Sequence, residues 1–69
     1  MIKWLQINMD RFESMDGRFL ITQVFNSFYG YHWRLEDRGK KPVSVYIDYS
    51  FRNCKAKAEE LYAKDKNTK

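Results

Sequence analysis

Three side chains that could support acid–base chemistry lie at alternate positions of one short segment: His32, Arg34 and Glu36. Alternate residues of a β-strand point to the same face, so an extended segment would place these side chains together. A His–Glu pair beside an arginine that stabilises an anion could cleave RNA by proton transfer. The alternative is an exposed histidine beside two ordinary surface charges. We favour the alternative and expect no enzymatic activity.

Metal and cofactor chemistry has little support in the composition. The chain has one histidine and one cysteine, and its glycines, Gly17, Gly30 and Gly39, are too scattered for a phosphate-binding loop. Metal sites usually need three or four converging His, Cys or carboxylate ligands, which His32 and Cys54 lack at suitable spacing. We expect no metal and no cofactor, and we expect Cys54 to be a small core residue.

Basic and aromatic side chains point more clearly to binding. Thirteen Lys and Arg against nine Asp and Glu give a formal net charge of +4. On an open sheet face, guanidinium groups could bind phosphate or guanine, and aromatic rings could stack on bases. The residues predicted to contact DNA or RNA are Arg18, His32, Arg34, Tyr46, Lys40 and Lys41. Glu36 and Asp48 are predicted on the same face and would repel phosphate.

A second group of residues points to protein recognition. Three large aromatic residues, Phe25, Phe28 and Tyr29, lie close together in the sequence. A single turn of so small a domain cannot bury all three rings. Aromatic residues dominate the energetics of protein interfaces. The predicted protein-binding residues are Leu20, Phe25, Phe28 and Tyr29. Alternatively, these residues cap the core or pair with a second copy, so the chain would be a monomer or a homodimer.

The elements that must position these residues begin with strands. Residues Tyr29–Asp37 and Val43–Phe51 alternate in a period of two, which predicts antiparallel strands joined by a turn at Arg38–Pro42. Segments Arg11–Met15 and Arg18–Phe25 flank Asp16-Gly17, a dipeptide typical of a hairpin turn. An additional strand is predicted at Ile2–Ile7.

A helix is predicted over Arg52–Lys66, which no Pro or Gly interrupts, with Ser50 as its N-cap. Its apolar stripe contains Phe51, Cys54, Ala58, Leu61 and Tyr62. The polar tail Asp65–Lys69 is expected to fray.

These elements predict an α+β domain of two layers, with three or four antiparallel strands on one C-terminal helix. Residues 1–64 form the single domain. The sheet face predicted to contact the helix carries Tyr31, Trp33, Leu35, Val45, Ile47 and Tyr49. Because one helix covers one face of a sheet, the other face is expected to be open.

Composition excludes several classes of protein. With 43% hydrophobic and 17% aromatic residues, the chain is not disordered, and one cysteine cannot form an internal disulfide. No secretory leader is recognisable at the N-terminus and no membrane segment is expected, so the predicted location is cytoplasmic.

Two resemblances add to these expectations. The first resemblance is to the DNA-binding domains of tyrosine-integrase amino termini and plant ethylene-response factors. It rests on the order of Gly17, Phe19, an aromatic strand with Trp33, and a helix with Ala58 and Tyr62. The resemblance covers about residues 17–64. Those domains read the major groove with an open sheet face, which implies DNA contacts by Arg18, Arg34 and Tyr46.

The whole chain is also similar to small proteins encoded by bacteriophages. The shared pattern comprises Trp4, Asp16-Gly17-Arg18-Phe19-Leu20-Ile21, Trp33-Arg34-Leu35 and Ala56-Lys57-Ala58-Glu59. This resemblance implies a compact, non-enzymatic protein in the host cytoplasm. Nucleic acid is the first partner expected from the sequence. The alternative is a host protein, bound and inhibited through the aromatic surface.

Overall fold

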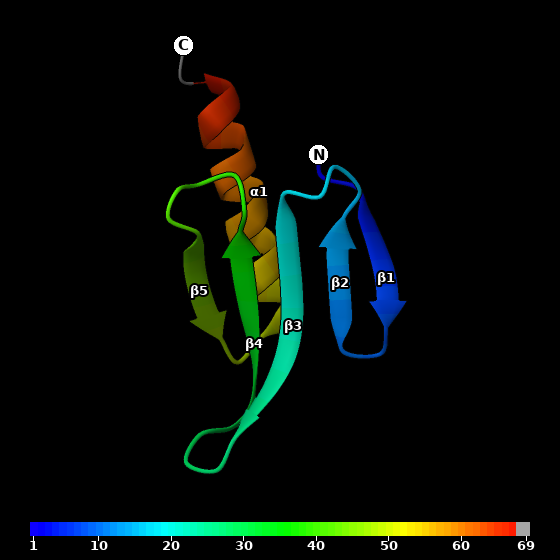
Figure 1. The fold of residues 1–69 in the computed structure, drawn as a ribbon, viewed down its shortest axis with the longest axis vertical. Helices are drawn as coiled ribbons and strands as arrows, with labels where there is room; N and C mark the ends of the chain where they lie inside the picture. The colour runs from blue at the N-terminus through cyan, green and yellow to red at the C-terminus, as the bar shows by residue number, and fades with distance from the viewer. Residues whose placement is uncertain (68–69) are drawn as a thin grey trace.

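The computed structural model describes residues 1–67 as one antiparallel sheet with a helix packed on one face (Figure 1). The elements are β1 (Trp4–Asn8), β2 (Arg11–Ser14), β3 (Phe19–Asn26), β4 (Gly30–Asp37), β5 (Ser44–Asp48) and α1 (Phe51–Asn67). The strand order β1-β2-β3-β4-β5 follows the sequence. The predicted α+β fold of two layers is therefore confirmed, with five strands in place of three or four.

The core lies between α1 and the middle of the sheet. Phe19, Ile21 and Leu35 from β3 and β4 meet Cys54 and Ala58 from α1, and all five side chains are fully buried. Partly buried residues surround them: Trp4, Phe12, Trp33, Tyr46, Phe51, Leu61 and Tyr62. The predicted apolar stripe of the helix is therefore confirmed. Its large rings suit a short chain, because aromatic side chains bury the most apolar surface per residue.

Both ends of α1 are held by hydrogen bonds or ion pairs. Ser50 Oγ accepts a hydrogen bond from the Asn53 backbone N–H at 3.3 Å, which confirms the predicted N-cap. The helix continues to Asn67, and Asp65 pairs with two cations described below, while fraying from Asp65 onward stays a prediction. The end of the predicted tail, residues 68 and 69, lies outside the described residues.

The sheet face assigned to β5 was predicted wrongly. Leu35 in the core lies opposite Tyr46, so Tyr46 faces α1 while Val45 and Ile47 face away from it. Alternation shows which residues share a face, but the turn between β4 and β5 decides which set meets the helix. Here the turn pairs Asp37 with Ser44 and thereby directs the even-numbered residues of β5 toward α1.

The β3–β4 hairpin extends beyond the other strands, away from α1 (Figure 1). These two strands have eight residues each, whereas β1, β2 and β5 have four or five. The molecule is accordingly elongated, with dimensions of 42 × 21 × 20 Å. The far end of this hairpin therefore has no helix to cover it.

Candidate functional site

The residues predicted to bind nucleic acid do not form one surface. His32 and Arg34 lie on the open face of the sheet, as expected. Tyr46 lies on the helix side, opposite Leu35, and its hydroxyl donates a hydrogen bond to Asp48 at 3.0 Å. Arg18 turns toward α1, where it is engaged by acidic residues. The prediction that Arg18 and Tyr46 share the open face with Arg34 was wrong.

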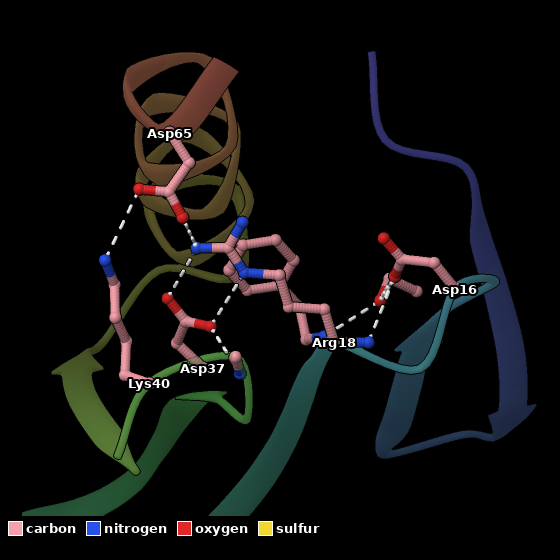
Figure 2. A network of polar contacts seen from close by, with 8 residues as sticks. Asp16, Arg18, Asp37, Lys40 and Asp65 are labelled. Carbon is pink, nitrogen blue, oxygen red and sulfur yellow. Dashed lines mark hydrogen bonds and ion pairs between the residues drawn. The ribbon is translucent and has the colours of Figure 1, made fainter. Parts of the chain in front are cut away.

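Arg18 is held by two carboxylates (Figure 2). Its Nε and Nη2 donate to the two oxygens of Asp37 at 2.9 and 3.0 Å, and Nη2 also pairs with Asp65. Asp37 is only 1% exposed, and the Arg18 hydrogen bonds hold the pKa of this carboxyl below its usual value. Arg18 thus compensates a buried charge, because a carboxylate removed from water needs such a partner.

The turn after β4 belongs to the same network. The Gly39 backbone N–H donates to Asp37 at 3.0 Å, and Lys40 Nζ pairs with Asp65 at 3.3 Å (Figure 2). A Cβ atom at Gly39 would lie 2.8 Å from Arg18 Nε, so a side chain there would displace the guanidinium. Lys40 therefore helps to join the turn to α1, while Lys41 is exposed in the turn itself.

The open face carries charges of both signs. Arg34 Nη2 pairs with Glu36 at 3.0 Å on the same strand. The strand register places Arg11 and Arg34 in one row across the sheet, on either side of Thr22. The next row contains two glutamates, Glu13 and Glu36, on either side of Leu20. Two arginines and two glutamates at such spacing give this face little attraction for a phosphate backbone.

The acid–base residues have separate partners. His32 Nδ1 lies 3.3 Å from the Gly30 carbonyl oxygen, and its ring meets Tyr49 edge-on at 6.5 Å between centroids. Glu36 is engaged by Arg34 instead. The geometry therefore places an Arg34–Glu36 ion pair beside the histidine.

The far part of the β3–β4 hairpin has the most exposed aromatic residues. We call residues Phe25 to Tyr31 the aromatic hairpin; its exposed rings, Phe25, Phe28, Tyr29 and Tyr31, are 64 to 89% accessible. The rings of Phe25 and Tyr31 pair across the two strands at 5.1 Å between centroids. Three of these rings were predicted to be surplus to the core. Tyr31 was missed, because its position in the alternation assigns it to the helix-facing side.

The turn of the aromatic hairpin is fixed by its own residues. Asn26 Oδ1 accepts hydrogen bonds from the backbone N–H groups of Phe28 at 2.7 Å and Tyr29 at 3.2 Å. Gly30 adopts φ +75°, a conformation that residues with a side chain rarely adopt. A turn built in this way holds the exposed rings in a defined arrangement.

A hollow of about 430 Å³ lies beside the aromatic hairpin. It is lined by Asn26, Tyr29, His32, Ile47, Asp48 and Tyr49. Asp48 is the one acidic residue in this lining, and its carboxylate already accepts hydrogen bonds from Tyr46, Ser50 and Asn53. The hollow is therefore suited to an apolar or aromatic side chain of a partner.

Leu20, the fourth residue predicted to bind protein, is 4% exposed. It lies on the open face between Glu13 and Glu36 in the strand register. Its assignment to an exposed interface was therefore wrong, because a buried side chain offers almost no surface to a partner. Tyr49 and Ile47, which sequence reasoning placed under the helix, supply exposed apolar surface on this side instead.

No helix in residues 1–67 is long and apolar enough to cross a membrane, and no three His, Cys, Asp or Glu residues in that range are grouped to hold a metal ion. The buried Cys54 thiol has its pKa raised to about 11 by burial, which keeps it protonated at neutral pH. Comparison of the chain with protein-family models, curated proteins and solved structures finds no match.

Proposed function

We propose that this chain is a non-enzymatic binding protein that recognises another protein through the aromatic hairpin and the adjacent hollow. The observation that carries the proposal is the exposure of four aromatic rings on a hairpin that extends past the core. Exposed apolar surface of this kind in a small domain commonly marks an interaction site.

The chemistry of the aromatic hairpin fits a protein partner with an apolar pocket. Residues 25–31 contain neither lysine nor arginine, so this segment has no side chain that would bind phosphate. Phe and Tyr rings each bury roughly 150–250 Å² at an interface and act as anchors there. A host protein, bound and inhibited by this surface, is the partner that the resemblance to small bacteriophage proteins implies.

Nucleic-acid binding through the basic residues stays a prediction, and the arrangement of charges gives it less support. Arg18 is committed to Asp37 and Asp65, and Arg34 is paired with Glu36. Lys41 and Arg38 are exposed in the turn between β4 and β5, at the end of the sheet remote from the aromatic hairpin. These two cations are therefore far from the rings of the aromatic hairpin (Figure 1).

The test compares two exposed apolar residues, each in a hairpin turn. Phe28 is 89% exposed in the aromatic hairpin, and Met9 is 90% exposed between β1 and β2. The wild-type chain, Phe28→Ser and Met9→Ser are immobilised and incubated with host lysate, with and without nuclease. We expect a protein that is retained by the wild type and Met9→Ser after nuclease treatment but lost with Phe28→Ser.

Circular dichroism should give the same melting temperature for both variants, since neither side chain is in the core. Partners that vanish after nuclease treatment would favour the nucleic-acid prediction. Equal retention by Phe28→Ser and the wild type would contradict recognition through the aromatic hairpin.

A further inference from the structure

The sheet has two free edges, and they differ in how well they are protected against added strands. At β1 the pairing with β2 shifts register between Gln6 and Asn8, which is a bulge. Bulges and charged side chains are the usual means by which proteins prevent strand addition at an edge. β5 pairs with β4 in unbroken register from Ser44 to Asp48, and no charged residue occurs from Val43 to Ile47.

The outward side chains of this segment form an apolar strip. Val43, Val45, Ile47 and Tyr49, which we call the β5 strip, are 48 to 66% exposed. Their spacing by two residues places them on the open side of the sheet, since Val45 and Ile47 lie opposite Glu36 and Arg34. A regular edge strand with an apolar strip is a template for pairing with another strand.

We propose that β5 pairs antiparallel with β5 of a second copy of this chain, about a two-fold axis at Tyr46, to form one continuous sheet. The proposal is independent of the protein partner proposed above. Two-fold pairing uses the same strand twice and closes the assembly at two chains.

The sequence of β5 is complementary to itself in this register. Pairing about Tyr46 places Val45 opposite Ile47 of the second copy, and Val43 opposite Tyr49. On the helix side, Ser44 comes to lie opposite Asp48 of the second copy, so that a hydroxyl donor meets a carboxylate. Apolar side chains that lie directly opposite each other are the pairs that stabilise a sheet.

Like charges do not share a row of the sheet in this register, whereas they do in its neighbours. Arg34 lies next to Ile47, and Glu36 next to Val45, across the β4–β5 pair. With the axis at Tyr46, the row that contains Arg34 continues into the row that contains Glu36 of the second copy. An axis at Val45 would align Glu36 with Glu36, and an axis at Ile47 would align Arg34 with Arg34. Opposite charges across an interface favour the first arrangement.

The helix side of the same edge leaves room for a second copy. A shallow hollow of about 250 Å³ lies there, lined by Tyr46, Asn53, Ala56, Lys57 and Glu60. Lys57 lies over the Tyr46 ring, 5.6 Å from its centroid, and pairs with Glu60 of its own chain at 3.1 Å, so its charge is compensated without a second copy.

The first test uses two residues at opposite ends of one row of the sheet. Val45 on β5 and Leu5 on β1 are 52% and 53% exposed, and each lies beside a glutamate. The masses of the wild type, Val45→Lys and Leu5→Lys are measured by light scattering over a range of concentrations. We expect the wild type and Leu5→Lys to reach twice the chain mass of 8.4 kDa. The concentration at which half of the chains are dimeric should be about a hundredfold higher for Val45→Lys than for the wild type.

A wild-type mass of 8.4 kDa at every concentration would overturn the proposal, as would a Val45→Lys chain that dimerises as well as the wild type. A cooperative melting transition of both variants, measured at a concentration low enough for the wild type to be monomeric, would show that both are folded.

The second test examines the register. Val45→Cys and Ile47→Cys chains are mixed and oxidised, while buried Cys54 is left in place because its thiol is fully buried. We expect a disulfide between the two different variants and much slower cross-linking of either variant alone. Rapid cross-linking of Val45→Cys with itself would place the axis at Val45 and contradict pairing about Tyr46.

Discussion

At one end of the sheet, charged side chains pair with one another, whereas at the other end the aromatic hairpin leaves its rings in solvent. Arg18, Asp37, Lys40 and Asp65 join β3, β4, the β4–β5 turn and α1 (Figure 2). The aromatic hairpin lies remote from α1 and has rings with no core to enter (Figure 1). The difference shows that Arg18 and Lys40 are engaged in contacts within the fold, whereas the exposed rings lie outside the core.

The same contrast bears on what the net charge says about this surface. A formal charge of +4 suggests a surface for phosphate, yet Arg18 and Arg34 both have carboxylate partners within 3.0 Å. Ion pairs lower the positive potential that a polyanion would meet. We call the end of the sheet that contains Arg18, Asp37, Lys40 and Asp65 the paired end. Substitutions made separately at the paired end and in the aromatic hairpin test whether the first affects stability and the second affects binding.

The largest effect is expected from Asp37→Asn at the paired end. This substitution leaves Arg18 partly buried without its bidentate partner, which should lower the free energy of unfolding by about 3 kcal/mol. Urea denaturation measures the change, and Asp10→Asn, at an exposed aspartate, is the matched control. Partner binding through the aromatic hairpin should persist wherever the variant is folded. A variant as stable as the wild type would show that the pair contributes nothing.

Acid should weaken the same end. The hydrogen bonds from Arg18 hold the pKa of Asp37 below its usual value, so the folded state keeps this carboxyl ionised at lower pH than the unfolded chain does. The resulting stability is present above the unfolded value of about 3.9 and is lost as the pH falls through the folded pKa. Urea denaturation at a series of acidic pH values gives the free energy of unfolding at each pH. This free energy should change less with pH for Asp37→Asn than for the wild type. An identical dependence on pH would exclude Asp37 as the source of the acid sensitivity.

A smaller effect is expected at the aromatic hairpin. Tyr31→Ser removes an exposed ring that pairs with Phe25, so it should weaken partner binding by about tenfold, the amount typical of an interface side chain. The melting temperature should change little, because Tyr31 is outside the core. Titration of the partner captured by the wild type gives the affinity. If Tyr31→Ser lowers the melting temperature and the folded fraction binds the partner as tightly as the wild type does, the Tyr31 ring stabilises the fold and does not contribute to binding.

The smallest effect is expected from Lys40→Ala. Lys40 and Asp65 are both exposed, and solvent screens such pairs strongly. The urea midpoint should therefore change by little more than the error of the measurement. A large loss of stability would mean that the turn depends on Lys40 rather than on the Gly39 hydrogen bond to Asp37.

Local patterns in the sequence were sufficient for most of the fold. The alternation in β4 and the helical stripe from Phe51 to Tyr62 are set by neighbouring residues, so they can be recognised without knowing the rest of the chain. The exposure of Phe28 followed from counting more rings than a small core can hold. These inferences need only the spacing of apolar residues along the chain and the number of large side chains that a small core can hold.

The errors have two physical causes: contact between segments distant in sequence, and the geometry of a single turn. Arg18 and Asp37 are 19 positions apart, and no periodicity relates an arginine in one turn to a carboxylate at the end of another strand. The direction of Tyr46 depended on the geometry of one turn, and the exposure of Tyr31 on where the helix begins. Some residues of the candidate site could therefore be predicted from the sequence, but their arrangement could be described only from the structure.

The meander order of the strands also has a consequence for how the chain folds. Every strand pairs with its neighbours in sequence, so the sheet can grow by successive hairpins without closing a long loop. The docking of α1 joins segments that are far more distant, as in the hydrogen bond from the Ile2 backbone N–H to Glu59 at 3.0 Å. Pairing between strands that are neighbours in the sequence favours rapid folding, because each hairpin closes only a short loop.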